Sequence, residues 1–182
     1  MINAFETLGI PLGLVFTDEA LREAFRLAGK MVHPDAGGKD GEFASLREAF
    51  AVVSSPSRRL RHWLEWRGIT AETRGAIAPS LMDFFTEIGT ITQQAQAFIR
   101  RRSEAKSALV RAMLEGEAQL CRESVERLIA RLEVMICHEC GAFPQLEITE
   151  NLDVEGASTV ARSLAFLEKW RASLRAIFAQ LL

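Results

Sequence analysis

Two stretches of this sequence place apolar residues at helical spacing, and a glycine-rich segment separates them. In the first stretch Leu21, Phe25 and Val32 fall on one helical face. The inward face of the second stretch is formed by Phe43, Leu46, Phe50 and Val53. Residues 36–41 contain too much glycine for a helix and are predicted to form an exposed loop. Burial of both apolar faces away from water is favourable, so the pattern predicts a hairpin of two antiparallel helices whose apolar faces pack together.

The predicted tip of this hairpin carries the tripeptide His33-Pro34-Asp35. Proline at this point ends the first helix, since the residue before a proline is pushed out of the α region. Arg22, Arg26 and Lys30 follow one another at intervals of four residues on the first helix, so they form a basic ridge beside the apolar face. The sequence therefore predicts a rigid turn that presents an imidazole and a carboxylate next to an exposed cationic surface.

Short helices are predicted on both sides of the hairpin. Residues 3–9 form one of them and contribute Phe5 and Leu8 to the same core. Ser55 and Pro56 supply a cap and a proline at the first helical position, which predicts that another helix begins there. The apolar residues that this helix turns inward are Leu60, Trp63 and Leu64.

The rest of the chain is predicted to be long helices, after a boundary between Gly68 and Pro79. A first apolar stripe starts at Leu81 and can be followed to Met113, which indicates one long helix that reverses near Gly116. Two further stripes occupy residues 120–136 and 160–181. Three amphipathic helices predict an antiparallel bundle. We therefore expect an all-α protein with an N-terminal domain over residues 1–75 and a three-helix bundle over residues 76–182.

Composition limits the classes of partner. The chain has 182 residues, 48% of them hydrophobic, and a formal net charge of -2, which suits two small domains and predicts neither nucleic-acid nor membrane binding. No apolar run approaches the roughly 20 residues that span a bilayer, and the N-terminal residues do not resemble a secretory signal. A cytoplasmic location is expected. An odd number of cysteines, three, argues against a disulfide framework.

The order of short helix, basic helix, His-Pro-Asp turn, apolar helix and final helix resembles a J-domain. Residues 3–10 (Asn-Ala-Phe-Glu-Thr-Leu-Gly-Ile) match the opening of such domains, and residues 48–56 match their third helix and its exit. The resemblance implies that the protein binds an ATP-loaded chaperone of the DnaK class and stimulates ATP hydrolysis. The residues that it implies for this contact are His33, Pro34, Asp35, Arg22, Arg26 and Lys30.

A J-domain followed directly by a helical bundle is similar to the HscB family of iron–sulfur cluster co-chaperones. Residues 81–83 and 163–171 resemble stretches of that family's bundle. The resemblance implies that the bundle binds an IscU-like cluster scaffold through Leu81, Met82, Phe85 and Phe166. Helical geometry turns Met82, Phe85 and Phe166 about 140°, 80° and 90° away from the centres of their stripes. These three side chains are therefore expected at a binding patch, or else packed against the N-terminal domain.

Cys137 and Cys140 form a CxxC pair that could supply two thiolates to a metal or act as a redox pair. Cys121 lies about four helical turns upstream, so it cannot reach the pair if all three residues share one helix. A complete metal site would then need ligands from elsewhere. The alternative is that the pair marks only a helix end near Gly141.

Together these patterns predict a co-chaperone that is not itself an enzyme and holds no cofactor. Its partners would be a DnaK/HscA-class ATPase and an IscU-like scaffold as client. Two alternatives stay open: a J-protein with the same trigger and a different client, and a metal or redox carrier that uses Cys137 and Cys140.

Overall fold

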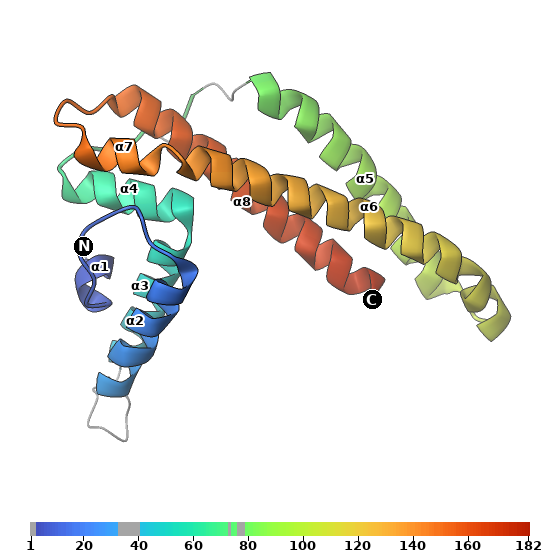
Figure 1. Cartoon of the computed structure of the whole chain (residues 1–182). Coiled ribbons are helices and arrows are strands. Elements are labelled where there is room, and N and C mark those ends of the chain that lie inside the picture. The colour runs from blue at the N-terminus through green and yellow to red at the C-terminus, as the bar shows by residue number, and fades with distance from the viewer. Residues whose placement is uncertain (1–2, 33–40, 73, 76–78) are drawn as a thin grey trace. The chain divides into compact units, whose positions relative to one another are not determined.

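The computed structural model describes residues 3–32, 41–72, 74–75 and 79–182, and all regular structure in these ranges is helical (Figure 1). The helices are α1 (Ala4–Thr7), α2 (Asp18–Met31), α3 (Glu42–Ser54), α4 (Pro56–Trp66), α5 (Pro79–Glu104), α6 (Ala108–Cys140), α7 (Phe143–Ile148) and α8 (Val154–Leu181). Within these ranges, none of the helices has both the length and the hydropathy of a membrane span. The predicted all-α class is confirmed.

The chain divides into two compact units. The first consists of Met1–Gly75 with Cys140–Ala165, and the second of Ala76–Glu139 with Phe166–Leu182. One division between the two units falls after Gly75. The segment 140–165, however, groups with the N-terminal residues, which differs from the single bundle domain expected over 76–182.

In the first unit, α2 and α3 form the predicted hairpin and lie side by side (Figure 1). Thr17 caps α2, because its hydroxyl oxygen accepts a hydrogen bond from the backbone N–H of Ala20 at 3.1 Å. The ring of Phe25 on α2 lies 4.7 Å from that of Phe50 on α3. Phe43, predicted to face inward, is 42% exposed, because it sits in the first turn of α3, at the edge of the contact between the two helices.

The helices on either side of the hairpin complete this core. Phe5 and Leu8 are buried, as expected. In α4, Ser55 accepts a hydrogen bond from the backbone N–H of Arg58 at 3.3 Å, with Pro56 at the first helical position. The inward residues predicted for α4, Leu60, Trp63 and Leu64, are all buried.

Residues 140–165 join the first unit through polar contacts that periodicity alone cannot predict. The buried Arg59 on α4 donates to the carbonyl oxygen of Val53 and places its guanidinium 5.5 Å from the ring centre of Phe143 on α7. Glu147, also on α7, accepts hydrogen bonds from the backbone N–H groups of Leu14 and Val15. Through these contacts α7 packs against α4 and against the loop before α2.

The segment before α5 is held in the same unit by α8. Arg162 donates hydrogen bonds to the carbonyl oxygens of Glu72 and Arg74 at 3.1 and 3.4 Å. The hydroxyl of Ser158 accepts from the backbone N–H of Glu72 at 3.2 Å. Backbone groups outside a helix need such partners when they are half-buried, which explains why the first half of α8 belongs to this unit.

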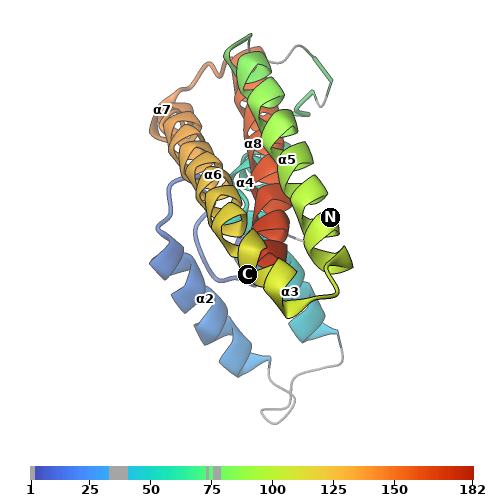
Figure 2. The ribbon, with the colours of Figure 1, turned by 90° about the vertical axis from the view of Figure 1, so that its right-hand side faces the viewer.

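The second unit is a three-helix bundle of α5, most of α6 and the second half of α8, in which consecutive helices run in opposite directions (Figures 1 and 2). Its core contains Phe84, Ile88, Phe98, Val125, Leu128, Leu132, Leu174 and Leu181, all of them buried. Arg131 on α6 pairs with Glu87 on α5 at 2.6 Å, and Arg175 on α8 pairs with Glu133 on α6 at 2.5 Å. The predicted bundle is confirmed.

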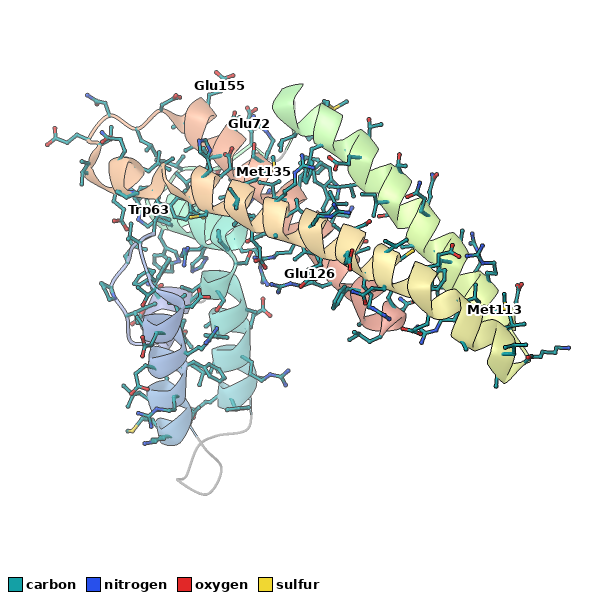
Figure 3. The ribbon with its side chains drawn as sticks, turned by 45° about the vertical axis from the view of Figure 1, so that its right-hand side comes forward. Trp63, Glu72, Met113, Glu126, Met135 and Glu155 are labelled. Carbon is teal, nitrogen blue, oxygen red and sulfur yellow. The ribbon has the colours of Figure 1, made fainter. Side chains whose placement is uncertain are left out.

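The reversal between the first two bundle helices lies at residues 105–107 and not near Gly116. The hydroxyl of Ser107 accepts a hydrogen bond from the backbone N–H of Val110 and so caps α6. Gly116 lies inside α6, where a Cβ would meet nothing within 4 Å. The prediction was wrong because a glycine permits a turn without requiring one. Figure 3 shows Met113 near the end of α6 that follows this reversal.

Candidate functional site

The basic ridge of α2 is exposed, as its spacing predicts. The side chains of Arg22 and Arg26 are 75% and 53% exposed, and Lys30 is exposed as well. Each arginine has an acidic neighbour on the same helix. Arg22 lies 3.9 Å from Asp18, and the Nε atom of Arg26 donates to Glu23 at 2.7 Å.

Glu23 neutralises part of the positive charge of the basic ridge. The hydrogen bond from Arg26 lowers the pKa of the Glu23 carboxyl, with a smaller contribution from the charge of Lys30. The same hydrogen bond raises the pKa of Arg26. Both groups are therefore ionised at neutral pH and neutralise one another in part. Exposed pairs of this kind contribute little to stability.

His33, Pro34 and Asp35 lie outside the described residues. Their role as the trigger of a chaperone ATPase stays a prediction. The described helices on either side of them in the sequence are α2, which ends at Met31, and α3, which begins at Glu42.

The apolar residues that the resemblance assigns to the client divide into two groups. Met82 and Phe85, on α5, are each 54% exposed, whereas Leu81 is 3% exposed and belongs to the bundle core. Phe166 on α8 is half-buried. Leu81 can thus affect a client only through the packing of α5, because a buried side chain has no surface to offer. The calculated orientations of Met82 and Phe85 agree with their exposure.

Trp170 brings Phe85 and Phe166 into one aromatic cluster and was not among the predicted contact residues. Its ring lies 5.6 Å from that of Phe85 on α5 and 6.0 Å from that of Phe166 one turn earlier on α8. The signal in the sequence was the interval of four residues between Phe166 and Trp170, which places both on one face of a helix. We call Met82, Phe85, Phe166 and Trp170 the aromatic face of the bundle.

The cysteines lie on α6 as the geometric argument assumed. Cys137 is exposed and Cys140 half-buried in the last turn, while Cys121 is 16 residues upstream of Cys137 on the same helix, about 24 Å along its axis. Cys121 therefore cannot join the pair. Among the residues that the structure describes, no group of three or more His, Cys, Asp or Glu side chains is arranged to hold a metal ion.

Known proteins resemble this chain in two ways: some share part of its sequence, and one shares the fold of the whole chain. No protein-family profile matches the sequence. A tetratricopeptide repeat and J domain-containing co-chaperone, DNJ1 of Cryptococcus neoformans, is 38% identical over 58 residues, 32% of this chain and 11% of that protein. The chaperone protein DnaJ of Caldicellulosiruptor saccharolyticus is 37% identical over 62 residues, 32% of this chain and 16% of the relative. Human DnaJ homolog subfamily C member 18 is 38% identical over 63 residues, 33% of this chain and 17% of the relative.

The chain thus spans less than a fifth of each of these relatives. Among solved structures, the chaperone HscB from Vibrio cholerae matches with a TM-score of 0.57 and 18% identity, and the match covers 100% of both chains. The expected resemblance is confirmed: about a third of the sequence is similar to J-domain proteins, and the chain as a whole has the fold of the chaperone HscB.

Proposed function

We propose that this protein is a J-domain co-chaperone that stimulates the ATPase of a DnaK/HscA-class chaperone and is not itself an enzyme. The observation that carries the proposal is the exposed basic ridge of α2, which leads directly into His33-Pro34-Asp35. Complementary charge speeds the encounter of two proteins and sets their orientation. Asp35 would then accept charge-assisted hydrogen bonds from an arginine of the chaperone.

We further propose that the client is an iron–sulfur scaffold protein of the IscU type. Support comes from the HscB fold over the full length of the chain and from the aromatic face, where Met82 and Phe85 are each 54% exposed. Large apolar side chains at this exposure favour a protein-binding surface. The co-chaperone would bind the scaffold through the bundle while its J-domain engages the ATPase.

The decisive experiment measures steady-state ATP hydrolysis by a DnaK/HscA-class chaperone with and without the full chain. We expect stimulation that is lost in His33→Gln and in Asp35→Asn, with unchanged circular dichroism. Equal stimulation by His33→Gln and by the unaltered chain would contradict the proposed trigger.

A second measurement tests the client. The full chain is needed, because residues 140–165 pack with the N-terminal unit and a fragment starting at residue 76 would leave them without their partners. Isothermal titration with an IscU-type scaffold should detect binding. ATPase stimulation without scaffold binding would indicate a J-protein with another client.

A further inference from the structure

The neighbours of His62 on α4 require its Nε2 atom to be unprotonated. Its side chain is 9% exposed, and Nε2 lies 3.0 Å from the backbone nitrogen of Ala4 and 3.1 Å from Nε1 of Trp66. Both neighbours are N–H donors with no lone pair to offer. Nε2 must therefore act as the acceptor, and the ring proton belongs on Nδ1.

This contact joins α1 to α4 across 58 residues of sequence. The ring of Phe5 stacks on that of His62 with their centres 5.5 Å apart. Figure 1 shows how short α1 is beside the other helices. A helix of four residues has almost no stability of its own, so its position depends on contacts such as these.

The charged groups around His62 do not favour the imidazolium strongly. On its own helix, Glu65 lies 3.8 Å from Nδ1 and is 42% exposed. On α3, Glu48 lines the same pocket as His62 but is paired with Arg58 at 2.5 Å. On α1, Glu6 is exposed. Burial lowers the pKa of His62 below its ordinary value of 6.5, and the charge of Glu65 opposes that effect only in part.

We propose that His62 is an acid-sensitive latch: in its neutral form it holds α1 against α4, and a proton on Nε2 releases α1. Protonation would place an N–H at Nε2 directly opposite the N–H groups of Ala4 and Trp66, so at least one of the three groups must move away. The backbone of Ala4 is the most easily displaced, because α1 has only four residues.

The pH dependence has a definite sign. When α1 is released, His62 meets water and binds protons more readily than in the docked state. The docked state is therefore fully favoured above about pH 6.5, and it is lost progressively as the pH falls from there towards the lowered pKa of docked His62. This dependence is independent of the proposed co-chaperone function and can be tested without any partner.

The test is an NMR titration of the isotope-labelled full chain between about pH 8 and about pH 5. At neutral pH, the His62 ring nitrogens should report the tautomer with the proton on Nδ1, and the ring should titrate with a midpoint below 6.5. The hydrogen-exchange protection of the Ala4 amide should fall by about tenfold for each pH unit between 6.5 and that midpoint. A proton found on Nε2 at neutral pH, or a midpoint at or above the ordinary value, would overturn the proposal.

Two variants separate a latch from a merely structural histidine. His62→Gln keeps an oxygen that can accept from Ala4 but cannot titrate, so protection of the Ala4 amide should become independent of pH. Trp66→Phe removes one donor from Nε2 at a residue that is 42% exposed, so the His62 midpoint should rise towards 6.5. The pH range over which Ala4 protection falls should then become narrower. An equal loss of Ala4 protection in His62→Gln and in the unaltered chain would contradict the latch, as would a midpoint that Trp66→Phe leaves unchanged.

Discussion

The indole of Trp170 on α8 lies 5.6 Å from the ring of Phe85 on α5, at an angle of 40° between the ring planes. This contact connects two helices of the bundle and unites residues that are 85 positions apart in the chain. Phe85 is 54% exposed although it makes this contact, so the cluster is both ordered and accessible. Preorganised aromatic groups of this kind dominate many protein interfaces.

We expect Trp170→Ala and Phe85→Ala each to weaken binding of an IscU-type scaffold by about 5- to 30-fold, which is the range for an interface anchor worth 1–2 kcal/mol. The binding free energy lost in the double variant should be smaller than the sum of the losses in the two single variants, because the two rings share one contact. Isothermal titration with the full chain measures all three values. The matched control is Val134→Ala on α6, where a residue that is 69% exposed should not affect the affinity. Equal effects at Val134 and Trp170 would contradict the aromatic face as the client site.

Glu23 and Arg26 should have opposite effects on the chaperone ATPase. Glu23→Gln removes the carboxylate that neutralises Arg26 and should lower the chaperone concentration needed for half-maximal stimulation. Arg26→Gln removes a cation and leaves Glu23 unneutralised, so it should raise that concentration several-fold. Both effects should shrink as salt increases, because exposed charges are screened beyond about 8 Å at physiological ionic strength. Arg127→Gln on α6, whose guanidinium bonds its own helix, is the control and should leave the stimulation unchanged.

Replacement of Gly75 and of Gly89 by alanine should change the free energy of unfolding in opposite directions. At Gly75 a Cβ would lie 2.8 Å from Cζ of Arg162, which is buried and bonded to two backbone carbonyls, so Gly75→Ala should cost about 1–3 kcal/mol of unfolding free energy. At Gly89, inside α5, a Cβ meets nothing within 4 Å, so Gly89→Ala should add about 0.5–1 kcal/mol. Urea unfolding followed by circular dichroism distinguishes the two signs. A neutral Gly75→Ala would show that Arg162 does not fix this segment.

Cys121 should react with iodoacetamide more slowly than Cys137 at neutral pH. Burial and the negative charge of Glu117 raise the pKa of the Cys121 thiol, and the thiolate is the reactive form. Cys137 is exposed, so access does not slow its reaction. Mass spectrometry of peptides after timed alkylation gives the two rates. Faster labelling of Cys121 would be inconsistent with its half-buried position.

Periodicity in the sequence determined the helices and their inward faces wherever burial is decided by neighbours along the chain. Leu21 and Leu46 are buried, as their spacing predicts, and Met82 points outward for the same geometric reason. The cap at Ser55 was also predictable from the sequence, because a cap acts within three residues of itself. The basic ridge follows from the spacing of its members alone.

Only the tertiary structure decided which helices share a unit and which surface residues meet. The pairing of Arg59 with Phe143, of Glu147 with Leu14, and of Arg162 with Glu72 joins residues 84 to 133 positions apart, and no local pattern records such a choice. The same holds for Phe85 and Trp170, and for His62 and Ala4. Whether a segment is helical depends mainly on interactions between residues that are close in the sequence. These long-range contacts depend instead on how whole helices pack against one another in the core.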